Sequence, residues 1–207
     1  MPPQKLRERQ KRQRVAQVLD AAALLFTTRG YEATRIEEIA ETASVAPATI
    51  YNYFATKPNL LMALAVRHVR SALPERRALL RVPPDDPMEG INAFETLLAN
   101  QATRYLSREC WRVILSAQYL GPGGQAHRTG IRLNLLIRRH YVQLLRHYQR
   151  LGRLHPLVDP DDLATLIVGI TTWHFAGYIS SDTMTVRELL DTGTRHLRLV
   201  LAGLVVP

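Results

Sequence analysis

The chain has 207 residues, a formal net charge of +9 at pH 7 and 46% hydrophobic residues. This length and apolar content suffice for a folded core, and the positive charge favours an anionic partner without proving one. The single cysteine, Cys110, excludes an internal disulfide framework and a cysteine-based zinc site. We expect a cytoplasmic protein, because the sequence shows no signal peptide and no apolar run approaching the roughly 20 residues of a membrane span.

The predicted secondary structure is helical nearly throughout, and it follows a basic segment. Residues 1–14 contain six basic side chains and one acidic one. Such an arm can lie along DNA phosphates or enter the minor groove, and a frayed solubilising tail is an equally good interpretation. A first helix then runs to about Arg29 and ends at Gly30, where glycine favours a left-handed cap.

The segment from Thr34 to Lys57 predicts two short amphipathic helices that meet at a tight turn. Apolar residues recur at helical spacing on both sides of the turn. Thr34 and Glu37 have the spacing of a capping box for the first helix, and Pro47 suits the first turn of the second. This is the outline of a DNA-binding helix-turn-helix, with a surface helix pair of some other all-helical protein as the alternative.

The second of these helices would read DNA, because its surface side chains are short or hydrogen-bonding and none is acidic. Alanine and threonine methyls can contact a thymine methyl, and asparagine can pair with adenine. Tyrosine and threonine hydroxyls, with a lysine, can hold phosphates. The candidate DNA-binding residues are Thr34, Arg35, Ala46, Pro47, Ala48, Thr49, Tyr51, Asn52, Tyr53 and Lys57.

Four short runs occur together between residues 18 and 64: Ala-Ala-x-x-Leu-Phe, Arg-Gly-Tyr, Thr-x-x-x-x-Ile-Ala and Thr-Ile-Tyr-x-Tyr-Phe-x-x-Lys. With them this segment resembles the amino-terminal domain of the tetracycline-repressor (TetR) family. Two residues depart from that family's pattern. Ser44 stands where the family usually has glycine in the turn, so a non-glycine residue has to adopt an unusual conformation. Ala46 stands where a capping serine or threonine is common.

The rest of the chain predicts six further helices from caps and breakers. A fourth helix runs from Thr56 to Pro74, a fifth opens at Asp86, and a shorter one covers 107–119. A long helix covers 126–153, and two more open at Asp159 and Thr185. We therefore predict an all-α fold of about nine helices. A three-helix DNA-binding domain spans residues 1–58, and a larger ligand-binding and dimerisation domain spans residues 59–207.

The last two predicted helices carry long apolar stripes interspersed with small residues. They are more apolar than one small domain needs, which predicts a four-helix bundle with a second copy of the chain. The resemblance implies the same arrangement, and the alternative is a core hairpin within a monomer. The candidate dimer-interface residues are Leu163, Leu166, Ile167, Ile170, Leu190, Leu197, Leu201 and Leu204.

An effector pocket is predicted from the aromatic residues of the second domain, which can line an apolar site between helices or simply fill the core. We therefore expect a largely apolar or aromatic small molecule, and no cofactor. No metal site is predicted, because His140 and His147 are about 10 Å apart on one helix. The arginine row at 128–153 is interpreted as a solvated face. The candidate pocket residues are Phe94, Trp111, Tyr119, Tyr141, Tyr148, Trp173, His174, Phe175 and Tyr178.

The predicted function is ligand-responsive transcription regulation. A homodimer binds a palindromic DNA operator and is released when a small-molecule effector enters the second domain; repression is what the resemblance implies. A nonspecific or architectural DNA-binding protein would use the basic arm and the arginine row instead. An enzyme with a spatially assembled site is the third reading, although the sequence carries no recognisable catalytic signature.

Overall fold

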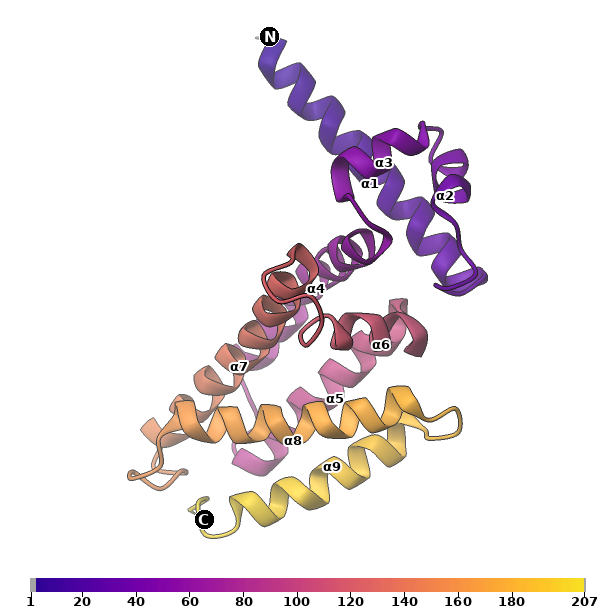
Figure 1. The fold of residues 1–207 in the computed structure, drawn as a ribbon. Coiled ribbons are helices and arrows are strands. Elements are labelled where there is room, and N and C mark those ends of the chain that lie inside the picture. The colour runs from indigo at the N-terminus through magenta and orange to yellow at the C-terminus, as the bar shows by residue number, and fades with distance from the viewer. Residues whose placement is uncertain (1–2, 207) are drawn as a thin grey trace. The chain divides into compact units, whose positions relative to one another are not determined.

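The structure, a computed structural model, describes the backbone of residues 3–206 and the side chains of residues 6–206. Its described part is all-α, as predicted, with one isolated β-bridge between Leu154 and Val205 (Figure 1). The helices are α1 (Pro3–Thr28), α2 (Ile36–Thr42), α3 (Pro47–Phe54), α4 (Lys57–Arg81), α5 (Pro87–Tyr105), α6 (Arg108–Ser116), α7 (Gln125–Arg150), α8 (Pro160–Ser180) and α9 (Val186–Leu201).

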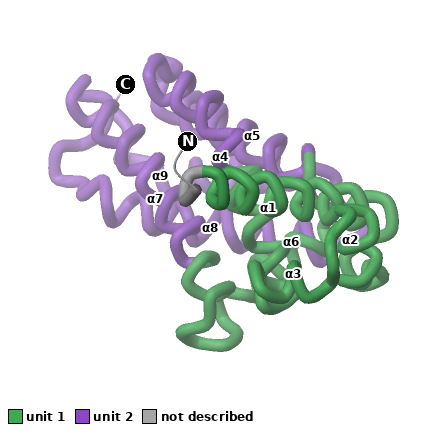
Figure 2. The backbone as a smooth tube through the Cα atoms, turned by 90° about the horizontal axis from the view of Figure 1, so that it is seen from above, with its two compact units in different colours: residues 1–69, 105–130 green, residues 70–104, 131–207 purple. Residues whose placement is uncertain are grey.

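The helices form two compact units, coloured separately in Figure 2. The first unit contains residues 1–69 and 105–130, and the second contains residues 70–104 and 131–207. Helices α4 and α7 contribute residues to both units, and so does the end of α5. The predicted domain boundary between residues 58 and 59 does not coincide with a boundary between these compact units, and it stays a prediction.

In the first unit, α2 packs against both α1 and α3. The apolar residues that recur at helical spacing are buried on all three helices: Val18 and Ala22 of α1 are 0% exposed, Ile39 of α2 is 0% exposed and Ile50 of α3 is 1% exposed. Burial of each of the larger apolar side chains stabilises the fold by about 1.5–3 kcal/mol. The long first helix therefore supports the pair α2 and α3.

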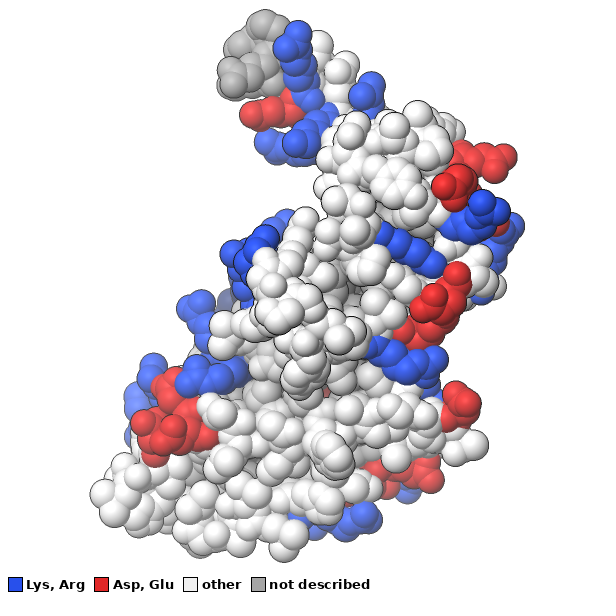
Figure 3. Space-filling view, in the orientation of Figure 1, with Lys and Arg blue, Asp and Glu red and all other residues white. Residues whose placement is uncertain are grey.

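The basic segment is helical in this structure, which differs from the predicted separate arm. Helix α1 already begins at Pro3, so the predicted start of the first helix was too late. Its first half exposes Arg7, Arg9, Lys11 and Arg12. Lys5, also predicted to belong to the basic arm, lies outside the residues whose side chains are described. Figure 3 shows basic side chains gathered near the amino-terminal end of the chain.

The second unit is built around α5, α7, α8 and α9. Its core includes three aromatic side chains, Phe94, Tyr141 and Tyr148, each 0% exposed, together with Ile167 of α8 and Leu197 of α9. Local caps place the helices that carry them. The predicted caps are confirmed at α5, where Asp86 Oδ1 accepts from Glu89 N at 2.8 Å, at α8 through Asp159, and at α9 through the capping box of Thr185 and Glu188.

Helix α4 continues through Pro74 to Arg81, although the sequence predicts an end at the proline. A proline inside a helix removes one backbone hydrogen bond and crowds the preceding turn. Buried residues on both sides of it, Ala72 and Leu80, hold the helix against the core. Packing therefore outweighs the local cost. Two other predicted helix ends were late, since α6 ends at Ser116 and α7 at Arg150.

One described helix, α8, is long and apolar enough to cross a membrane by length and composition alone, and 33% of that stretch is buried. The expectation that no segment approaches a membrane span therefore underestimated the length and apolar character of α8. A single helix of this kind is weak evidence for a span, because core helices of water-soluble proteins have the same composition.

Candidate functional site

The turn between α2 and α3 is formed by a non-glycine residue in a left-handed conformation, as predicted. Ser44 has φ +54, and its amide donates to Glu41 O at 3.0 Å while Val45 N donates to Ala40 O at 2.9 Å. A left-handed conformation costs roughly 1–2 kcal/mol for a residue with a Cβ. The hydrogen bonds across the turn and the buried Ile39 and Ile50 on either side hold the two helices at this angle.

Helix α2 begins one residue later than predicted, and the capping box of Thr34 and Glu37 is wrong. Glu38 supplies the carboxylate, which accepts from the Arg35 amide at 2.8 Å. Thr34 is 1% exposed, and its hydroxyl donates to the Gly30 carbonyl at 2.6 Å. Thr34 thus ties the end of α1 to the start of α2. Among the candidate DNA-binding residues it is the one that presents almost no surface.

Helix α3 presents the predicted reading face to solvent. It has no side-chain cap at Ala46, as predicted, and Pro47 stands in its first turn. The remaining candidates, Arg35 at the start of α2 included, are exposed or partly exposed, and Tyr51 is 47% exposed. No acidic residue occurs between residues 42 and 74. The face combines small residues for close approach with hydrogen-bonding ones, and no carboxylate repels phosphate. The exposed members are Arg35, Ala46, Pro47, Ala48, Tyr51 and Asn52, and the partly exposed ones are Thr49, Tyr53 and Lys57.

Two lysines connect this face to the rest of its unit. Lys57 Nζ donates to the Glu32 carbonyl at 3.2 Å and lies 4.3 Å from the ring centroid of Tyr31. Lys11 Nζ lies 5.9 Å from the ring centroid of Tyr53, within the range of a cation–π contact. The basic half of α1 and the start of α4 therefore place positive charge beside α3.

A contact that the sequence analysis missed fixes the turn between α1 and α2. The carboxylate of Glu109, on α6, accepts from the Tyr31 amide at 2.8 Å and from the Glu32 amide at 2.7 Å. Gly30 beside them has φ +89, and a Cβ there would lie 2.8 Å from Glu109 Oε2. The residues are 78 and 77 positions apart in the chain, so no local pattern indicates the contact.

The nine predicted pocket residues are divided between the two units. Phe94, Tyr141 and Tyr148 lie in the core of the second unit, and the rings of Phe94 and Tyr141 are 5.1 Å apart. Tyr119, in the first unit, is 73% exposed, and Trp173 on α8 is 77% exposed. The prediction was too broad, because aromatic character alone does not distinguish core, surface and pocket. Trp111 lies on α6 of the first unit, and His174, Phe175 and Tyr178 lie on α8.

Polar groups accompany the buried aromatic residues of the second unit. The Tyr141 hydroxyl donates to the Glu95 carboxyl, and burial raises the pKa of Glu95 to about 8, so this carboxyl is mostly protonated at neutral pH. Tyr148 donates to the Pro84 carbonyl at 2.8 Å. Burial and nearby arginines lower the pKa of His140 to about 4. Within the described part of the chain, no group of three or more potential ligands could hold a metal ion.

The predicted dimer-interface residues divide between the interior and the surface, which corrects that prediction. Four of them, Leu163, Ile167, Leu197 and Leu201, are at most 4% exposed within the protomer's own core, so they offer no surface to a partner. Leu166 is 59% exposed, and the other three, Ile170, Leu190 and Leu204, are partly exposed.

Further exposed apolar residues, which the prediction missed, occur on both α8 and α9. On α8 they include Trp173, which is 77% exposed, and on α9 Leu199, which is 75% exposed. A Cβ at Gly169 or Gly177 would meet nothing within 4 Å. We call Leu166, Gly169, Trp173, Gly177 and Leu199 the α8–α9 surface.

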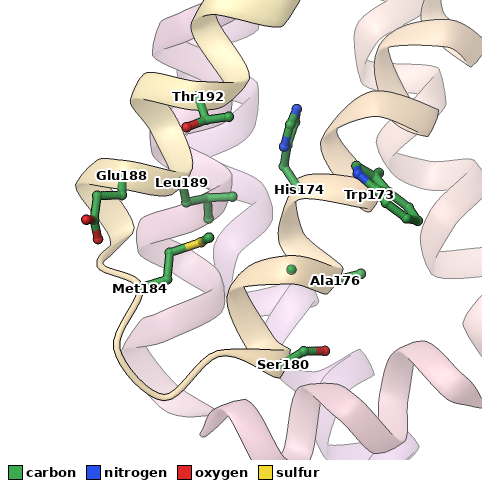
Figure 4. Close-up of a pocket in the computed structure, with 9 residues that line it drawn as sticks. Trp173, His174, Ala176, Ser180, Met184, Glu188, Leu189 and Thr192 are labelled. Carbon is green, nitrogen blue, oxygen red and sulfur yellow. The ribbon is translucent and has the colours of Figure 1, made fainter.

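An open groove of about 420 Å³ lies between the ends of α8 and α9. Figure 4 shows Met184 and Leu189 pointing into it and Trp173 turned away from α9. His174 Nε2 and His196 Nδ1 are 2.9 Å apart at its edge. Thus His174, predicted as a polar anchor or a core histidine, is paired with a histidine of the next helix.

One arginine of the predicted row on α7, Arg146, pairs with α8, and so does Arg138, which lies outside that row. Asp161 of α8 accepts from Arg138 at 2.8 Å through one carboxylate oxygen and from Arg146 at 2.8 Å through the other. Exposed pairs of this kind contribute about 0–1 kcal/mol each. The interpretation of the row as a solvated face stays a prediction.

Comparison with known proteins finds two likenesses in sequence. Residues 18–64 match the family model of the bacterial regulatory proteins of the tetR family. The chain is also 36% identical over 96 residues to the HTH-type transcriptional activator FasR of Mycolicibacterium smegmatis. That match covers 45% of this chain and 44% of FasR, so the chain matches less than half the length of this relative.

Solved structures share the fold over nearly the whole chain. The TetR-family transcriptional repressor FadR of Thermus thermophilus, in complex with lauroyl-CoA, superposes with a TM-score of 0.73 at 21% identity, covering 93% of this chain and 96% of FadR. A regulator from Saccharomonospora viridis in complex with choline superposes with a TM-score of 0.68 at 20% identity, covering 93% of this chain and 98% of that one. At such identities these likenesses establish the fold alone.

Proposed function

We propose that this chain, which belongs to the TetR family of bacterial regulatory proteins, is a ligand-responsive transcriptional regulator that binds a palindromic operator as a homodimer and is released by a small-molecule effector. The family is non-enzymatic, which removes the enzyme alternative. A regulator of this kind acts on DNA in the cytoplasm. The domain boundary between residues 58 and 59 is part of the same proposal.

The observation that carries the proposal is the exposed face of α3. It is held by the buried residues of α1 and α2, it presents Tyr51 and Asn52 beside the small Ala48, and no carboxylate interrupts it. A helix of this size enters the major groove, where asparagine and alanine can contact base edges. Lys57 and the basic half of α1 flank it and can contact phosphates.

Homodimerisation is supported by two arguments. One short recognition helix offers too little contact for operator-level affinity, so a two-fold pair with half-sites about 34–36 Å apart is expected. The α8–α9 surface is apolar and exposed within one protomer, and exposed patches of this kind mark protein–protein contacts. Its small residues, Gly169 and Gly177, allow close helix approach.

The effector is proposed to bind within the second unit, around its buried aromatic residues. The solved relatives show that the fold accommodates different ligands, since FadR was determined with lauroyl-CoA and the S. viridis regulator with choline. FasR is an activator and FadR a repressor. We propose repression here, with an effector that acts through its differential affinity for DNA-competent and DNA-incompetent states.

The test is binding of the purified protein to DNA fragments from around its own coding region and to random DNA, at two salt concentrations. We expect one fragment to be bound far above random DNA, at a stoichiometry that is a multiple of two protomers. Equal binding to every sequence with a steep salt dependence would instead support the architectural alternative.

Substitution of Tyr51 identifies the reading helix. Tyr51→Ala should weaken binding to the selected fragment and leave the fold and the dimer intact, because the side chain is exposed. Tyr119→Ala removes another exposed tyrosine of the same unit and serves as the matched control. Unchanged operator affinity in Tyr51→Ala, or an equal loss in Tyr119→Ala, would show that α3 is not the reader.

A further inference from the structure

A buried arginine without a counter-charge lies in the second unit. Arg76 of α4 is 5% exposed and forms no ion pair with any described side chain. Its Nε donates to the neutral Gln101 amide at 2.8 Å, while Nη1 is buried and has no hydrogen-bond partner. An isolated buried cation is strongly disfavoured, and the structures that retain one normally supply an opposite charge.

Neighbouring acids do not fill this role. Glu75, the next residue along α4, pairs with Arg104 and accepts from Gln101. Glu95 accepts from Tyr141 and is mostly protonated near pH 7, because burial raises its pKa to about 8. Burial lowers the pKa of Arg76 only to about 10, so the guanidinium is still a cation at neutral pH.

A second buried nitrogen near Arg76 also lacks a partner. His140 Nδ1, on α7, is buried without a hydrogen bond. Burial first, and then the charges of Arg76, Arg139 and Arg77, lower the pKa of this histidine. Three guanidinium groups therefore create a positive potential at a neutral imidazole, which can donate from Nδ1 in one of its tautomers.

Aromatic side chains adjoin the His140 ring. The His140 ring packs edge-on against Phe94 at 5.8 Å, and Phe94 packs against Tyr141 at 5.1 Å. Both Phe94 and Tyr141 are 0% exposed. A ligand held here would meet one cation, one neutral donor and aromatic carbon.

We propose that Arg76 and His140 form the anchor for a small organic carboxylate with an apolar body, with Arg76 Nη1 and His140 Nδ1 donating to its two oxygens. A monoanion matches the single buried cation, whereas a phosphate would bring a second charge into the same low-dielectric site. The inference rests on the proposed function, since it names the chemical class of the effector.

The test measures binding to the full chain with matched neutral controls. Decanoate is compared with decanamide, and phenylacetate with phenylacetamide, by calorimetry and by thermal unfolding. At least one acid should bind the wild-type protein at least tenfold more tightly than its amide. Arg76→Met should lower this preference to within about twofold, because it removes the charge and retains the bulk. Arg81→Met, which removes an exposed arginine at the end of the same helix, should keep it.

Stability without ligand separates a binding role from a structural one. Ligand-free Arg76→Met should unfold at the same temperature as the wild-type protein or higher, because an uncompensated buried charge is replaced by an apolar side chain. A lower unfolding temperature combined with a retained acid preference would show that Arg76 is structural. Equal binding of acids and amides to the wild-type protein, or no binding of either acid, would overturn the proposal.

A measurement on the wild-type protein covers the case in which Arg76→Met does not fold. With isotope-labelled histidine, the preferred acid should shift the ring signals of His140 and leave those of the exposed His155 unchanged. Unchanged His140 signals would overturn the proposal. Operator binding is measured separately, so a protein that binds the acid but no specific DNA would refute the regulator and leave the anchor in place.

Discussion

Removing the Glu109 carboxylate should loosen the turn that leads from α1 into α2. Two backbone amides, those of Tyr31 and Glu32, donate to it at 2.8 and 2.7 Å. Hydrogen bonds to a charged group contribute about 1.5–3 kcal/mol each when buried. Since Glu109 is partly exposed, water competes for both amides, and we expect Glu109→Ala to cost about 1–2 kcal/mol for the pair of bonds.

The assay is hydrogen exchange of the two amides. A local loss of 1–2 kcal/mol corresponds to roughly 5–30-fold faster exchange at Tyr31 and Glu32. Glu89→Ala is the matched control, because it removes an exposed first-turn glutamate from α5 and so reproduces the lost interaction with a helix dipole. Unchanged exchange in Glu109→Ala, or an equal acceleration in Glu89→Ala, would refute the assignment of Glu109 as the acceptor that fixes this turn.

Three further predictions concern one residue each. Lys57→Ala should weaken binding to all DNA sequences similarly and lower the salt slope by about one, as measured by titration at several salt concentrations. Gly90→Ala should lower the free energy of unfolding by about 1–3 kcal/mol in urea, because the new Cβ would collide with the Tyr148 hydroxyl. For Glu95, the pKa in the folded protein, about 8, lies above the ordinary value of 4.5. The free energy of unfolding should therefore fall by roughly 2–4 kcal/mol as the pH rises from 4.5 to 8. Glu95→Gln should remove most of this pH dependence.

The sequence by itself determined the features that depend on residues a few positions apart. The caps at Asp86, Asp159 and Thr185 follow from such local interactions, and the structure has them. The left-handed Ser44 and the uncapped Ala46 were implied by the family resemblance, and the structure has these too. The helix-turn-helix also belongs to this class, since its apolar spacing, turn and short reading helix lie within one short segment.

Tertiary structure decided which side of each element is covered. Helix α8 is apolar around most of its circumference, so its sequence does not reveal that Ile167 is buried while Leu166 and Trp173 are exposed. Thr34 could cap α2, but the carbonyls that end α1 draw its hydroxyl inward.

The charged contacts show the same limit most clearly. Glu109 and the amides it holds are separated by more than 70 residues. Arg76 is buried and Arg77 is exposed, although both are arginines in the same stretch of α4. Periodicity gives the direction of a side chain around its own helix, but only the packing of the other helices determines whether that direction leads to water, to a backbone amide or into the core.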